Sequence, residues 1–224
     1  MSRIAATIAT FLLAVFSYIL VTACTDNFLL PAGHSSHQQK AAIAIRDAAP
    51  GYLQWGTEHF TVPYLEKYYT DWYYINEEPG NNHKKAFQNA LITALKKYTT
   101  VDLYLLAHTN NYYKWVREIK PALRKNLRLV YNSGCEDLNQ ANTWLKLGAQ
   151  TYIGHPGRSA SPLFYFYFLR RWTRNGSIEH AVRTANNGMY KLLNIGGFFS
   201  PELNPTEVYD QSVAHISGNT RLQF

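Results

Sequence analysis

The sequence lacks several features that mark large classes of proteins. It has no tandem repeat and no low-complexity block. It also has no basic arm or Arg-rich tract, because its 22 Lys and Arg residues are spread along the chain. We therefore find no nucleic-acid-binding module and expect no nucleic-acid partner. The net charge of +7 is typical of a solvated surface, although it also favours anionic headgroups or acidic partners.

Charge is also missing from a long stretch near the N-terminus. The stretch from Ile4 to Val21 follows a basic start and contains no charged residue. An apolar run of this length could span a membrane, but small residues that lead directly into a cysteine are more typical of a cleavage site. The residues Val21, Thr22, Ala23 and Cys24 resemble the lipobox of bacterial lipoproteins.

The lipobox resemblance implies a division of the chain into three regions. Residues 1–23 would be a signal peptide that is removed, residues 24–40 the lipidated Cys24 with a polar tether, and residues 41–224 a single domain. We expect the lipid to anchor the protein in the bacterial cell envelope. Thr25, in place of an acidic residue after the cysteine, indicates sorting of the protein to the outer membrane. The domain would then face the periplasm or the cell surface. The alternative is an uncleaved signal anchor with an ordinary Cys24.

Cysteine is scarce, and its scarcity makes the second cysteine informative. If Cys24 is lipidated, Cys135 is the only thiol of the mature chain and has no disulfide partner. A lone thiol in an exported protein is either buried or kept for its reactivity. Taken alone, burial is the commoner outcome for a free cysteine.

Two short apolar runs, 101–108 and 127–135, each end in a reactive side chain. Both runs are rich in Leu, Val and Tyr, as buried parallel strands are, and a separation of about twenty residues is enough for a right-handed helical crossover. The carboxyl ends of parallel strands meet at one edge of a sheet. We therefore expect His108 and Cys135 to lie close together at that edge.

Apolar periodicity divides the rest of the chain into alternating strands and helices. Further strands are predicted at 41–46, 72–76 and 149–154, and helices at 62–69, 83–98, 112–119, 162–173, directly after Cys135 and from 178. The segment 41–46 is also compatible with a helix, and the tail after Gly197 has no strong periodicity. This alternation predicts an α/β fold of three layers, with a mostly parallel sheet flanked by helices on both faces.

The order of the two reactive residues resembles that of a known group of enzymes. One apolar run ends in His108 and the next ends in a small residue followed by Cys135, which is similar to the caspase-like cysteine peptidases, the group that includes caspases, gingipains and CHAT proteins. The segment from Gly176 to Ala181 also resembles the start of a CHAT-type helix. The resemblance covers residues 41–187 and implies a caspase-like fold with a His-Cys dyad.

The resemblance implies a role for each matching residue. Cys135 would be the nucleophile, and His108 would protonate the leaving amine. Backbone amides of Cys135 and of Thr109 or Asn110 would bind the oxyanion. The family usually has Gly where this chain has Thr109, and Ala where it has Gly134, so Thr109 puts full activity in question.

Several charged or polar residues near the predicted edge are candidates for substrate binding. Arg158 could pair with an acidic substrate side chain, and His155 is a further polar candidate. Asp137 and Asp102 could orient His108 or favour basic substrates. For each of them a structural role, in a loop, at a strand start or in the first turn of a helix, is an open alternative.

These observations together predict a membrane-anchored, caspase-like cysteine endopeptidase. It would act on a protein or peptide substrate, contact the membrane through its lipid anchor, and need neither a cofactor nor a metal. The first alternative is an inactive caspase-like lipoprotein that binds a protein partner at the same cleft. The second is a structural lipoprotein whose Cys135 merely packs.

Overall fold

A computed structural model describes residues 39–47, 51–77, 83–108, 110–159, 161–199 and 204–224. The expected signal peptide, the expected lipidation site Cys24, nearly all of the tether and Thr109 lie outside these residues. The predictions made for them therefore stay predictions.

The described residues form one six-stranded sheet in the order β2-β1-β3-β4-β5-β6. The strands are β1 (Ala41–Arg46), β2 (Asp71–Asn76), β3 (Val101–Leu106), β4 (Leu127–Asn132), β5 (Thr151–Gly154) and β6 (His215–Gly218). Strands β1 to β5 are parallel, and β6 pairs antiparallel with β5 at the edge. The predicted α/β fold with a mostly parallel sheet is confirmed.

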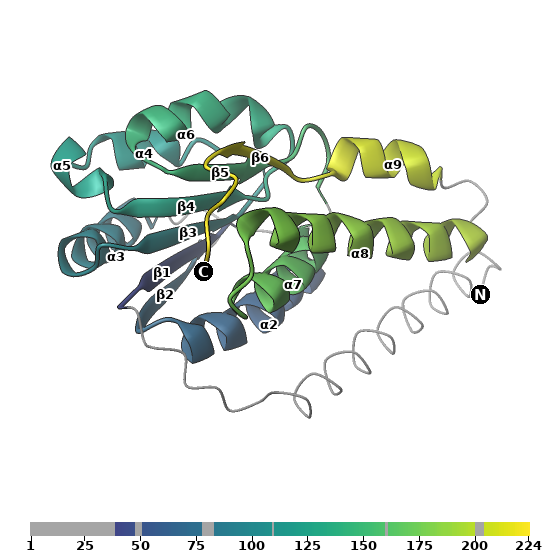
Figure 1. Ribbon diagram of the computed structural model, residues 1–224, viewed down its shortest axis with the longest axis horizontal. Helices are drawn as coiled ribbons and strands as arrows, with labels where there is room; N and C mark the ends of the chain where they lie inside the picture. Colours follow the sequence, from purple (N-terminus) through teal and green to yellow (C-terminus); the bar gives the residue numbers. More distant parts are fainter. Residues whose placement is uncertain (1–38, 48–50, 78–82, 109, 160, 200–203) are drawn as a thin grey trace.

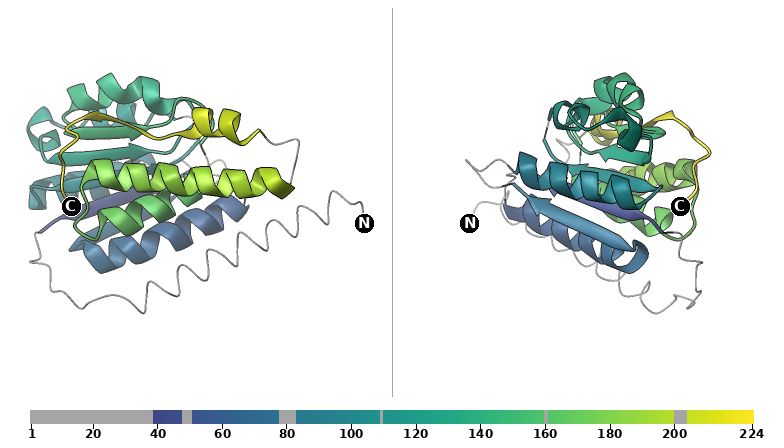
Figure 2. Two further views of the ribbon diagram at one scale, coloured as in Figure 1. Left: turned by 45° about the vertical axis from the view of Figure 1, so that its right-hand side comes forward. Right: turned by 90° about the vertical axis from the view of Figure 1, so that its left-hand side faces the viewer.

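Helices cover both faces of this sheet (Figure 1 and Figure 2). The helices α2 (Gly51–Tyr68), α7 (Ser161–Trp172) and α8 (Ile178–Phe199) pack on one face, and α3 (Lys84–Lys97), α4 (Tyr113–Arg117) and α6 (Ala141–Leu147) pack on the other. Shorter elements are α5 (Pro121–Arg124), the 3-10 helix η1 (Asp137–Gln140) and α9 (Pro205–Ser212). The three predicted layers are therefore present.

Alternate residues of each central strand supply the two hydrophobic cores. In β1, Ala42 and Ala44 join the core beneath α7 and α8, whereas Ile43 and Ile45 join the core beneath α3. All six residues of β1, β3 and β4 are buried. Strands covered on both faces read as continuous apolar runs, which is why they are recognisable in the sequence.

The structure differs from the sequence prediction mainly in α2 and in the tail. The helix predicted at 62–69 is the second half of α2, which begins at Gly51 and continues through Pro63. The tail holds α9 and β6, which periodicity did not predict. Strand β6 is short, is one of the two outermost strands of the sheet and is nowhere fully buried, so its sequence carries no apolar pattern.

Candidate functional site

The reactive residues of the predicted dyad follow neighbouring strands. Strands β3 and β4 pair in parallel, with Leu105 and Asn132 as the last paired residues. His108 and Cys135 each lie three residues beyond that pair, so both leave the sheet at the same edge. The His108 side chain is exposed, and Cys135 is a partly exposed thiol outside any disulfide.

The backbone of His108 is held by a carboxylate from a third strand end. The backbone N–H of His108 donates to Asp47 Oδ2 over 2.6 Å. Asp47 follows β1 directly and is partly buried. The sequence prediction did not include Asp47, although its place right after an apolar strand is the same signal that identified His108.

The loop that carries Cys135 is tied to β3 on one side and to the loop after β5 on the other. Ser133 donates its backbone N–H and its hydroxyl to the Leu105 carbonyl of β3, over 3.0 and 3.1 Å. On the other side, the N–H of Glu136 donates to Gly157 O over 2.9 Å. Glu136 has a left-handed backbone with φ of 60°, which turns the chain into η1. These contacts hold Cys135 at the carboxyl edge.

A small group of polar side chains, all buried except the partly buried Asn110, joins the two loops, and we call it the amide cluster. It consists of Asn110, Asn132, Asp137 and Gln140. The side-chain amide of Asn110 donates to Asn132 Oδ1 and to Asp137 Oδ2, each over 2.9 Å. Gln140 Nε2 donates to Asp137 Oδ1 and to the Asn110 carbonyl, each over 2.6 Å. Asn110 was predicted for its backbone amide, whereas the contacts seen here come from both its side chain and its backbone, which also hydrogen-bonds the Asp137 carboxyl.

Asp137 lies inside this cluster and not on the surface of the site. Only 1% of Asp137 is exposed. Burial raises the pKa of its carboxyl to about 7, although hydrogen bonds from Asn110, Asn132 and Gln140 favour the ionised form. Its position beneath the loop of Cys135 suits a structural acceptor better than a direct contact with substrate.

Gly134 leaves no room for a side chain. A Cβ at this position would lie 1.9 Å from Asp137 Oδ2 and 2.6 Å from the backbone oxygen of His108. This chain therefore needs glycine before Cys135 because the Asp137 carboxylate and the His108 loop fill that space.

We expect Gly134→Ala to lower the free energy of unfolding by about 1 to 3 kcal/mol, because overpacking forces buried groups apart. It should also slow the reaction of Cys135 with electrophiles, measured by mass spectrometry. Gly157→Ala is the matched control, since its Cβ would meet its nearest atoms at 3.0 Å. Equal stability of the two variants would contradict this account.

The other two substrate-binding candidates differ in exposure. His155 is fully buried, its Nδ1 contacts the Ser212 carbonyl over 2.6 Å, and it packs against the Phe164 ring. Because a carbonyl only accepts, Nδ1 carries the proton, and burial lowers the pKa of His155 to about 4. His155 is thus a neutral packing residue in this structure. Arg158 is exposed in the loop after β5, at the same edge as Cys135.

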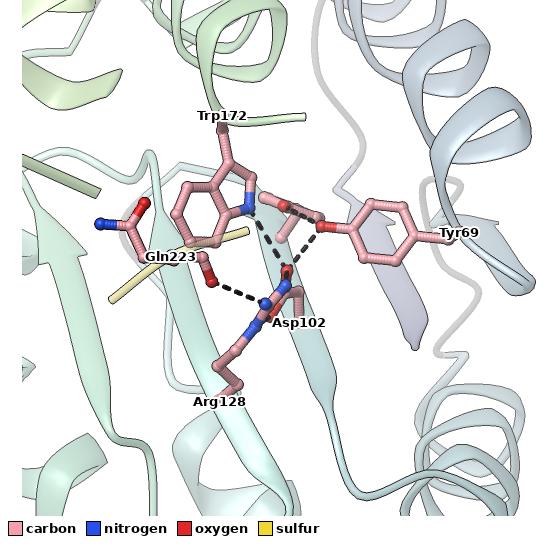
Figure 3. Close-up of polar contacts among 6 residues, drawn as sticks. Tyr69, Asp102, Arg128, Trp172 and Gln223 are labelled. Atoms are coloured by element: carbon pink, nitrogen blue, oxygen red, sulfur yellow. Dashed lines mark hydrogen bonds and ion pairs between the residues drawn. The ribbon is translucent and has the colours of Figure 1, made fainter. Parts of the chain in front are cut away.

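The hypothesis that Asp102 orients His108 is wrong. Asp102 is the second residue of β3, six residues before His108, and about 3.3 Å per strand residue puts their backbones roughly 20 Å apart. Its carboxylate accepts two hydrogen bonds from Arg128 of β4, from Nε over 2.8 Å and from Nη2 over 2.6 Å. Figure 3 shows Tyr69 and Trp172 donating to the same carboxylate. Asp102 therefore belongs to a buried ion pair at the opposite edge of the sheet.

No protein-family model matches this chain, and no curated protein matches it either. Within the described ranges, no helix has the length and hydropathy needed to cross a membrane, and no three His, Cys, Asp or Glu residues are grouped so that they could hold a metal ion.

Proposed function

We propose that this chain is a membrane-anchored, caspase-like cysteine endopeptidase that uses His108 and Cys135. The observation that carries the proposal is an exposed imidazole and a partly exposed thiol, each three residues beyond the last pair of two neighbouring parallel strands. The carboxyl edge of such a sheet is where α/β proteins build their sites. Membrane anchoring rests on the lipobox-like residues 21–24.

In the proposed reaction, the Cys135 thiol gives its proton to His108 and its sulfur attacks the carbonyl carbon of the scissile peptide bond. His108 returns the proton to the leaving nitrogen as the C–N bond breaks, which leaves a thioester on Cys135. Water then attacks the thioester, one of its protons passes to His108, and that proton returns to the departing sulfur. Proton transfer of this kind contributes about a hundred- to ten-thousand-fold in rate.

The tetrahedral intermediate of this reaction carries an oxyanion. The proposed donors are the backbone amide of Cys135 and one amide after His108, from Thr109 or Asn110. Removing one such donor typically costs about 3 to 4 kcal/mol of transition-state stabilisation.

The test is covalent labelling of the purified chain with a panel of peptidyl acyloxymethyl ketones under reducing conditions. We expect labelling at Cys135, none in Cys135→Ala, and labelling at least a hundredfold slower in His108→Ala, because the thiol loses its base. His59→Ala is the matched control, since it removes an exposed imidazole that lies in α2 and not in either loop of the proposed site. Equal labelling in His108→Ala would refute an activated dyad.

The second candidate is an inactive caspase-like module that binds a protein partner at the same cleft. The observation that favours it is Thr109 in the place where the family usually has glycine. If no probe labels Cys135 in the intact chain, this candidate gains support over the peptidase.

A further inference from the structure

The parallel ladder between β3 and β4 ends before the residues of the proposed dyad. Its last pair is Leu105 with Asn132, and His108 and Cys135 lie three residues further along each chain. Two separate loops therefore carry the imidazole and the thiol. Their relative position must be set by contacts beyond the ladder.

The side chain of Asn110 makes two hydrogen bonds that join the loop of His108 to the end of β4 and to η1. Its Nδ2 lies within hydrogen-bond distance of three acceptors, which its two hydrogens share. They are His108 O in its own loop, over 3.0 Å, and Asn132 Oδ1 at the end of β4 and Asp137 Oδ2 in η1, each over 2.9 Å. The His108 carbonyl can only accept, so the surroundings fix the orientation of this amide. Asn110 Oδ1 in turn accepts from the N–H of Tyr112, just before α4.

The partners of Asn110 are themselves held in the core. Asn132 is fully buried, and 8% of Gln140 is exposed. Gln140 Oε1 accepts from the indole of the fully buried Trp144, and the Asp137 carbonyl accepts from Tyr152 OH over 2.6 Å. The side-chain nitrogen of Asn132 is buried without a well-formed hydrogen bond, whereas the other side-chain groups of the network are paired with one another. Such a largely paired network favours a single geometry.

The backbone of His108 is therefore held at both ends. Asp47 accepts from its N–H over 2.6 Å, and Asn110 donates to its carbonyl over 3.0 Å. The direction of the Cα–Cβ bond, from which the imidazole extends, follows from this backbone. Only the Asn110 contact also reaches the loop of Cys135.

We propose that Asn110 is a positioning residue, whose side-chain amide fixes the loop of His108 against the loop of Cys135 and so sets the imidazole and the thiol at reacting distance. This inference rests on the proposed His-Cys chemistry. It assigns to the side chain of Asn110 a role distinct from that of its backbone amide.

The test measures alkylation of Cys135 by iodoacetamide as a function of pH, and labelling by the peptidyl ketones, in the intact chain. Alkylation reports the fraction of thiolate and needs no peptidase activity. We expect Asn110→Ala to slow ketone labelling about ten- to a hundredfold, because a misplacement of about 1 Å can cost a hundredfold. Its pH profile of alkylation should shift toward that of His108→Ala.

Asn110→Asp tests the loss of the NH2 donor alone, because it keeps the volume of the side chain. It keeps the shape but puts an oxygen against the oxygens of His108, Asn132 and Asp137, so we expect it to impair labelling at least as much as Asn110→Ala. In the double variant Asn110→Asp with Asp137→Asn, the donor and acceptor between these two positions are exchanged. We expect it to recover part of the lost rate.

Asn111→Ala is the matched control, because Asn111 is the exposed neighbour of Asn110 and should leave both profiles unchanged. An Asn110→Ala variant with reduced thermal stability but the pH profile of the unmodified chain would overturn the positioning role and leave the dyad standing. If His108→Ala itself leaves the profile unchanged, the proposed dyad fails, and the positioning role fails with it.

Discussion

Replacing Arg128 by methionine is expected to lower the free energy of unfolding by about 3 to 5 kcal/mol, because it leaves the Asp102 carboxylate buried without its cation. Asp102 is fully buried and Arg128 is 6% exposed. Burial alone would lower the pKa of Arg128, but the Asp102 carboxylate raises it above the usual value. Urea denaturation followed by tryptophan fluorescence measures the loss.

The surface pair of Lys97 and Asp71 is the matched control for this prediction. Its N–O distance is 2.7 Å, close to the 2.6 Å of the buried pair, but the Lys97 side chain is 58% exposed. We expect Lys97→Met to change stability little, since solvent screens an exposed pair. Similar losses of unfolding free energy in Lys97→Met and Arg128→Met would show that burial of the ion pair does not determine how much stability its removal costs.

A double variant tests whether the cost in Arg128→Met comes from the unpaired charge. With Asp102→Leu added, the buried charge is gone, although Tyr69 and Trp172 lose an acceptor. We expect the double variant to be more stable than the sum of the single losses predicts, by about 1 to 3 kcal/mol. Strict additivity would contradict the account.

The strands could be predicted from the sequence because the sheet is covered on both faces. Every residue of β3 and β4 is buried, so each appears as an apolar run of the right length. Asp102 and Arg128 are exceptions within these runs, and a single sequence cannot show that they pair across neighbouring strands. Asp102 was therefore assigned wrongly to the candidate site, although it lies at the opposite ends of the strands.

The edge residues of the candidate site were predictable for the same reason, whereas their supporting contacts were not. His108 and Cys135 each lie three residues beyond the last pair of two buried strands, so topology alone brings them to one edge. The contacts of Asn110 and Gln140 depend on the paths of two loops, which no periodicity encodes. The need for Gly134 likewise depends on where the Asp137 carboxylate lies.

The stability of the chain relative to its Asp137→Asn variant is expected to fall as the pH rises from about 4 to about 7. Burial raises the pKa of Asp137 from 3.8 to about 7, so between these values the folded state holds a proton that the unfolded state has released. Raising the pH then disfavours the folded state by up to about 1.4 kcal/mol per pH unit. The effect is complete above pH 7 and absent below pH 4.

The comparison with Asp137→Asn is needed because His155 acts in the opposite direction. Burial lowers the pKa of His155 to about 4, so its contribution to stability rises with pH up to the ordinary histidine value near 6.5. The two effects oppose each other in the wild-type profile, but subtracting the variant removes that of His155. Urea denaturation gives the free energy of unfolding of the wild type minus that of Asp137→Asn at each pH. We expect this quantity to be about 3 kcal/mol lower at pH 8 than at pH 5. A constant difference across this range would mean that Asp137 ionises as an ordinary exposed carboxyl does.

The ionised form of Asp137 can accept from both Asn110 and Gln140. The ionised carboxylate of Asp137, which burial disfavours, is therefore the form that best joins the loop of His108 to the loop of Cys135.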